Sequence, residues 1–93
     1  MRRLTWKPEK NAWLKKERGL SFEDIEEAIT HGQLKAVLVN RKQTNQIVLA
    51  VMLGDYIVAV PATVQPTLIM LRTAYYSRKL NERFGGKQDE EEI

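Results

Sequence analysis

The first thirty residues have the apolar spacing of two short helices. Pro8 follows the short run at 4–6 and can occupy the first turn of a helix, where its missing N–H costs nothing. Few apolar side chains follow it among many lysines, so a first helix over 8–18 is expected to bury only a narrow stripe. Gly19 suits the left-handed residue that ends such a helix.

A second helix is predicted by its start signals. The hydroxyl of Ser21 can accept a hydrogen bond from an N–H group of the following turn. Leu20 and Ile25 have the spacing of a hydrophobic staple. We expect this helix from residue 22 to about residue 30, with a stop at Gly32.

After Gly32 the pattern changes from helical to extended. Four strands are expected, over residues 36–39, 47–53, 56–60 and 67–73. The continuously apolar strand 47–53 is typical of a strand buried on both faces. A tight turn at Gly54 makes it the antiparallel neighbour of the next strand, which we expect Pro61 to end.

Two helices before a meander of strands predict an α+β domain. Both helices should pack on one face of a mainly antiparallel sheet built from residues 35–73. A short helix over 77–84, ended by Gly85, is expected to close a single domain spanning 1–86. The acidic segment 87–93 has too little apolar content to pack and is expected to be a mobile tail.

Composition narrows the classes of function. The chain has no cysteine and one histidine, so neither a thiolate zinc site nor a histidine cluster is expected, and no cofactor is predicted. It lacks a P-loop, a GxGxxG, a GxSxG and an HExxH. No apolar stretch has the length of a membrane span, and the N-terminus does not resemble a secretory signal, so we expect no membrane contact and a cytoplasmic location.

Charge is unevenly placed along the chain. Residues 89–92 hold four of the 12 acidic side chains, so residues 1–88 carry a formal charge of +7 against +3 for the whole chain. A basic surface attracts polyanions such as RNA. The alternative is that the surplus lysines serve solubility alone, and charge by itself does not decide between the two.

The end of the last predicted strand gathers cations and tyrosines. Arg72 ends an apolar strand, so its side chain must reach the rim or bind an anion such as a phosphate. If the strand continues, alternation places Tyr76, and not Tyr75, on the side of Arg72. Arg78 and Lys79 follow, either as further cations of the site or as solvated helix residues.

Two other places have candidate chemistry. His31 could serve as a general acid or base, since its ordinary pKa is near neutrality, or could bind carbonyls at the end of the second helix. Arg41 and Lys42 could hold an RNA backbone, or could belong to an ordinary polar turn.

Three stretches of the chain resemble one family. They are similar to motifs of the BrnT-like toxins: Trp6-Lys7-Pro8-Glu9-Lys10, Arg18-Gly19-Leu20-Ser21-Phe22-Glu23 and the sequence RTAYYSRK at 72–79. These are small bacterial ribonucleases with a RelE/ParE-like fold. Two positions depart from the family pattern: Lys7 stands where an acidic residue is usual, and Arg18 where histidine is usual.

The resemblance implies a metal-independent endoribonuclease that cleaves RNA and is neutralised by a cognate antitoxin. By that analogy Arg72 and Arg78 hold the scissile phosphate, Tyr76 or His31 transfers the proton, and Lys79 is an accessory cation. The residues expected to bind RNA are Lys10, Lys15, Arg41, Lys42 and Lys79. Ribosome dependence, RNA sequence preference and homodimer formation are left open.

Two alternatives stand beside the toxin hypothesis. The first is a non-catalytic domain of the same fold that binds RNA or a protein, which the departures at Lys7 and Arg18 leave open. A purely structural small domain is the third interpretation. A neighbouring reading frame that encodes an antitoxin would favour the toxin.

Overall fold

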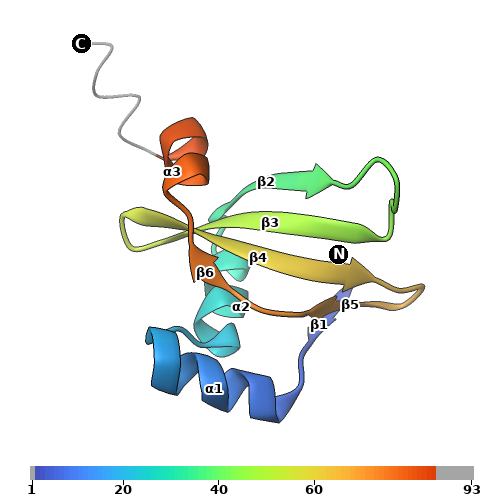
Figure 1. The fold of residues 1–93 in the computed structure, drawn as a ribbon, viewed down its shortest axis with the longest axis horizontal. Helices are drawn as coiled ribbons and strands as arrows, with labels where there is room; N and C mark the ends of the chain where they lie inside the picture. The colour runs from blue at the N-terminus through green and yellow to red at the C-terminus, as the bar shows by residue number, and fades with distance from the viewer. Residues whose placement is uncertain (1, 86–93) are drawn as a thin grey trace.

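Three helices and six strands make up residues 2–85, the part of the chain that the computed structural model describes (Figure 1). In chain order the elements are β1 (Arg3–Thr5), α1 (Pro8–Arg18), α2 (Phe22–Thr30), β2 (Leu34–Val39), β3 (Gln46–Leu53), β4 (Tyr56–Val64), β5 (Leu68–Leu71), β6 (Tyr75–Tyr76) and α3 (Arg78–Phe84). The α+β class expected from the sequence is confirmed. The predicted mobile tail over 87–93 lies outside the described residues.

The helices begin and end where their capping residues indicate. Pro8 opens α1, and Gly19 closes it with a φ of 66° while its N–H donates to the carbonyl of Leu14. The Oγ of Ser21 accepts a hydrogen bond of 3.1 Å from the N–H of Asp24 and so caps α2. Ser77 caps α3 in the same way. All three predicted helices are therefore confirmed.

Asn11 joins the first two helices. Its side chain is only 6% exposed, and its Oδ1 accepts a hydrogen bond of 2.8 Å from the N–H of Phe22. Its Nδ2 donates to both carboxylate oxygens of Glu23 at 2.9 Å. This side chain satisfies a backbone donor in the first turn of α2 and holds α1 against it.

The strands form one mixed sheet in the order β1-β5-β4-β3-β2, with β6 also paired to β4. The pairs β2–β3, β3–β4, β4–β5 and β4–β6 are antiparallel, as the meander predicted. The strand β1 pairs in parallel with β5, with Thr5 opposite Met70. The sequence pattern did not predict this parallel pair.

The prediction that Pro61 ends its strand was wrong, because β4 continues to Val64. The carbonyl of Pro61 accepts a hydrogen bond of 2.8 Å from the N–H of Arg72, on the side of β4 that faces away from β3. In a strand the N–H and C=O of one residue point to the same side. The missing N–H of Pro61 therefore costs no bond of the β3–β4 ladder.

The last strand predicted over 67–73 is present as β5, and a separate short strand, β6, follows it. The strand β5 ends at Leu71, opposite Ala62, and pairing resumes in β6 with Tyr75 opposite Ala59. One more residue lies between Leu71 and Tyr75 than between Ala59 and Ala62, which is the spacing of a β-bulge. Because of the extra residue, each side chain of β6 points to the face opposite to the one it would have in an uninterrupted strand.

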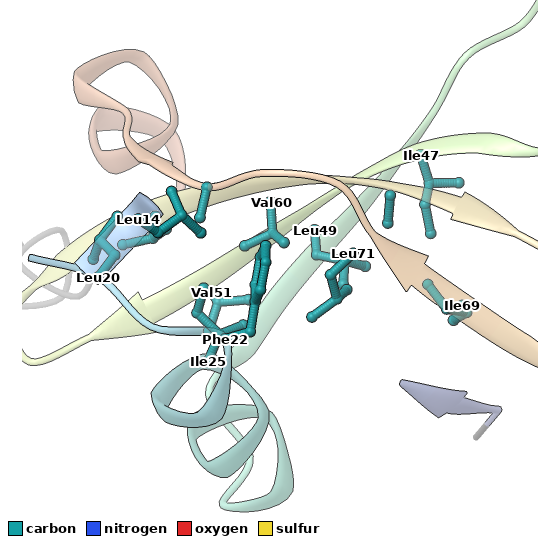
Figure 2. Close-up of a cluster of buried hydrophobic side chains, with 13 residues drawn as sticks. Leu14, Leu20, Phe22, Ile25, Ile47, Leu49, Val51, Val60, Ile69 and Leu71 are labelled. Atoms are coloured by element: carbon teal, nitrogen blue, oxygen red, sulfur yellow. The ribbon is translucent and has the colours of Figure 1, made fainter. Parts of the chain in front are cut away.

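The two faces of the sheet have separate cores. The helices α1 and α2 pack on the first face, where Leu14, Phe22 and Ile25 join inward side chains of β3, β4 and β5. Figure 2 shows Phe22 and Ile25 together with Val51 of the sheet in this cluster. The helix α3 packs on the second face through Leu80 and Phe84. Figure 1 shows α1 and α3 on opposite sides of the sheet.

The expected packing of both N-terminal helices on one face is therefore confirmed. Within residues 2–85, no helix has the length and apolar content of a membrane span.

Candidate anion-binding site

The second face of the sheet is covered by α3 at one end and hollowed at the other. Under α3 lie Ala50, Met52, Ile57 and Ala59. The uncovered half forms a hollow of about 500 Å³. It is lined by residues of β2, β3 and β4 and by residues at or beyond the strand ends: Leu38, Val39, Asn40, Gln46, Ile47, Val48, Pro61, Ala62, Thr63 and Arg72.

Arg72 lies where this hollow meets a second one. The smaller hollow, of about 240 Å³, is lined by Lys7, Lys10, Gln65, Met70, Leu71 and Arg72. The backbone N–H of Arg72 is held by the carbonyl of Pro61, and its side chain is exposed. The backbone of this residue is therefore fixed by the sheet while its guanidinium is available to a ligand.

The parallel pairing of β1 with β5 brings the cations of the smaller hollow together. Thr5 lies opposite Met70, so two residues further along each strand the chain reaches Lys7 and Arg72. Lys7 is the residue before α1, and Lys10 follows within the first turn of that helix. The Nζ of Lys10 also lies 4.3 Å from the ring centroid of Trp13, within reach of a cation–π interaction.

No carboxylate lines either hollow among the described residues. Four acidic side chains lie instead on α2, which packs on the first face: Glu23, Asp24, Glu26 and Glu27. The ion pair between Lys15 and Glu23, 3.6 Å long, is also on those helices. Two lysines and an arginine without a carboxylate partner form a site for an anion, and the planar guanidinium suits the oxygens of a phosphate.

The bulge before β6 decides which tyrosine faces the Arg72 side. Directly paired residues share a face, and Tyr75 lies opposite Ala59 of the second face. Tyr76 lies opposite Val58 of the first face and contacts the ring of Tyr56 edge to face, with centroids 5.9 Å apart. Tyr76 was expected on the side of Arg72 only if the strand ran without interruption from Arg72 to Tyr76. The bulge interrupts it, so Tyr76 lies on the other side.

His31 and the cations of α3 lie away from both hollows. His31 follows the last turn of α2, and its Nδ1 lies 2.8 Å from the carbonyl oxygen of Glu27 in a hydrogen bond. Arg78 and Lys79 are exposed in the first turn of α3, and neither lines a hollow. The structure thus brings together Arg72 and Lys10 from the predicted site residues, and adds Lys7.

The basic turn between β2 and β3 borders the larger hollow. Asn40, which lines it, accepts hydrogen bonds from the N–H groups of Lys42 and Gln43 through its Oδ1. Arg41 and Lys42 are both exposed in this turn. They extend the positive surface beyond the hollow on the side opposite Lys7.

Arg18 has a structural role at the division between β5 and β6. Its Nη1 donates a hydrogen bond of 2.7 Å to the carbonyl of Ala74, and lies 3.5 Å from the Oγ1 of Thr73. The end of α1 is thereby tied to the segment that separates Arg72 from Tyr75. At the position where the resembled family usually has histidine, this chain has a side chain that orients the bulge.

Comparisons with protein families, curated proteins and solved structures found no match to this chain. Among residues 2–85, no three His, Asp or Glu side chains gather as a bound metal ion would require. A function for this protein must therefore be proposed from the side chains that line the two hollows.

Proposed function

We propose that the protein is a toxin-like, metal-independent endoribonuclease, and that the RNA backbone binds after the end of β5, where the two hollows meet at Arg72. The observation that supports this most directly is the meeting of Lys7, Lys10 and Arg72 around a hollow without a carboxylate. The adjoining hollow of about 500 Å³ has room for the neighbouring ribose and base. We also propose a RelE/ParE-like arrangement of the fold, a cytoplasmic location and a cognate antitoxin as partner.

The reaction needs no cofactor. A base removes the proton of the ribose 2′-hydroxyl as the 2′-oxygen attacks the adjacent phosphorus. The bond from phosphorus to the 5′-oxygen then breaks as an acid gives a proton to the 5′-oxygen. The products are a 2′,3′-cyclic phosphate and a 5′-hydroxyl. In this proposal Arg72, which lines both hollows, holds the phosphate oxygens, whose negative charge grows in the transition state. Of the two tyrosines, Tyr75 is the one on the second face of the sheet, opposite Ala59, and is therefore the candidate for proton transfer.

Incubation of RNA with the purified protein, with and without ribosomes, tests this proposal. Fragments that end in a 2′,3′-cyclic phosphate are expected. Intact RNA under both conditions would reject the enzyme.

One observation favours the second candidate, a non-catalytic domain of the same fold that binds RNA or a protein. Neither hollow is lined by a side chain whose ordinary pKa is near neutrality, since His31 is bound to the carbonyl of Glu27 elsewhere. The two candidates share the binding step. RNA that is bound but not cut would decide for the second.

Binding to single-stranded RNA is expected to weaken steeply as salt rises, because each neutralised phosphate releases a condensed counterion. With three phosphates neutralised by Lys7, Lys10 and Arg72, the logarithm of the binding constant should fall with a slope of roughly −2 against the logarithm of salt concentration. Lys7→Ala should make this slope shallower by about 0.7. Titration by fluorescence anisotropy at several salt concentrations measures both.

The control is Lys16→Ala, which removes the same charge from an exposed position of α1 that lines neither hollow. Equal slopes for the two variants would mean that RNA does not contact the smaller hollow.

Removal of residues 88–93 is expected to strengthen RNA binding modestly. This change removes four carboxylates and raises the formal net charge from +3 to +7. A more positive protein attracts the polyanion more strongly, and the gain should vanish at high salt. Anisotropy titrations of the full and shortened chains measure the difference, and weaker binding by the shortened chain would contradict it.

A further inference from the structure

The strand β2 forms an open edge of the sheet with an apolar row. In the strand order of residues 2–85 it is terminal and pairs only with β3. Val37 is 48% exposed and Val39 is 55% exposed, although both are large apolar side chains. They lie opposite Leu49 and Ile47 of the first face, beyond the cover that α1 and α2 provide. Proteins usually block such an edge, because it can pair with another strand.

The backbone of the same two valines also points outward. The N–H of Asn40 donates to the carbonyl of Gln46 at 3.1 Å, so the backbone groups of Asn40 face β3. Alternation along an antiparallel pair then directs those of Leu38 toward β3 and those of Val37 and Val39 away from it. Two exposed side chains and four unpaired backbone groups therefore occupy one short stretch.

Cations flank this stretch on both sides. Lys35 lies two residues before Val37, where the register of β2 against β3 shifts between Leu34 and Ala36. Arg41 lies two residues after Val39, beyond the end of β2, and both side chains are exposed. Opposite charges across neighbouring strands stabilise their pairing and like charges oppose it. A strand that pairs with Val37 and Val39 should therefore have a carboxylate near each of its ends, close to these two cations.

We propose that β2 binds an extended segment of a separate protein as an additional antiparallel strand. The segment has two β-branched apolar residues, two positions apart, flanked at the same spacing by acidic residues. Its backbone pairs with the outward groups of Val37 and Val39, and its carboxylates face Lys35 and Arg41. This interface does not depend on the proposed RNA site.

A second copy of the chain fits this edge less well. An antiparallel pair of β2 strands centred on Leu38 would match Val37 with Val39, but would bring Lys35 of one copy close to Arg41 of the other. That arrangement sets like charges against each other at both ends of the pairing.

The test uses the full chain and the peptide Glu-Thr-Val-Thr-Val-Thr-Glu as probe. Amide resonances of Val37 and Val39 should shift on titration, and a peptide of the same composition with its valines four positions apart should bind at least about tenfold more weakly. Val37→Pro removes an outward N–H without breaking the bonds to β3 and should reduce binding at least about tenfold, whereas Val37→Thr keeps that donor.

Charge variants keep the test independent of the folding of Val37→Pro. Lys35→Glu with Arg41→Glu should weaken binding of the acidic probe and strengthen binding of a probe with lysines at its ends. Equal binding by Val37→Pro and Val37→Thr, or indifference of the charge variants to the probe, would overturn the proposal. Concentration-dependent dimers that Val37→Pro abolishes, without peptide binding, would assign the edge to a second copy and overturn it as well.

Discussion

Replacement of Arg72 by alanine is expected to lower the rate of RNA cleavage by about a hundredfold or more, because it removes the proposed contact to the phosphate, which would strengthen as charge develops. The fold should be unchanged. The guanidinium is exposed and the residue's structural bond, from its N–H to the carbonyl of Pro61, belongs to the backbone. Cleavage of RNA by the purified variant, beside its thermal unfolding, measures both effects.

Two further variants of the chain make this test specific. Arg72→Lys keeps the charge but loses the planar pair of donors, so its rate should lie between those of the wild-type and alanine proteins. Lys16→Ala removes a cation that lines neither hollow and should cleave as the wild type does. Full activity of Arg72→Ala would remove this residue from the site.

Growth provides a second measurement. Expression of the wild-type chain in bacteria without any partner should slow growth, and expression of Arg72→Ala should not. If the wild-type chain neither slows growth nor cuts RNA in the presence of ribosomes, the non-catalytic binding domain replaces the enzyme.

Replacement of Asn11 by alanine is expected to lower the free energy of unfolding by about 2–3 kcal/mol. The N–H of Phe22 would lose its partner in a buried place, and an unsatisfied buried donor costs about 1–3 kcal/mol, to which the space left by the side chain adds. Urea unfolding measures the loss. The control is Glu23→Gln, which alters an exposed partner of the same amide and should change stability little.

A stability of Asn11→Ala within about 0.5 kcal/mol of the wild type would contradict this account. It would mean that another group satisfies the N–H of Phe22.

The ionisation of Glu23 reports on the same link. The hydrogen bond from Asn11 is the largest of the causes that hold the pKa of this carboxyl below its usual value, followed by a backbone N–H, and Lys15 adds to it. A lowered folded-state pKa contributes stability above the unfolded pKa, and this contribution is lost as pH falls through the folded one. In Asn11→Ala the pKa of Glu23 should rise toward its usual value, as an NMR titration would show.

The ends of the helices could be predicted from the sequence because their signals act between neighbours along the chain. Pro8, Gly19, Ser21 and Ser77 each satisfy or release backbone groups within one turn. The strands could be located from their apolar runs for the same reason. Pro61 shows where such local signals fail. Whether a proline ends a strand depends on which side of the strand its nitrogen faces, and the sequence does not show this.

The candidate site depended on contacts between segments distant in sequence. Arg72 was identifiable as a cation at the end of an apolar strand. Lys7 was not, because only the parallel pairing of β1 with β5 places it beside Arg72, and no local pattern specifies that pairing. Likewise, the choice of Tyr75 over Tyr76 follows from one extra residue in a bulge.

The sequence by itself determined the helix boundaries, the existence of the main strands and the basic character of residues 1–88, since these depend on local spacing and on composition. Only the tertiary structure decided which side chains meet. The registers of β1 against β5 and of β4 against β6 are set by burial across the whole sheet, and shifting either by one residue would move its side chains to the opposite face.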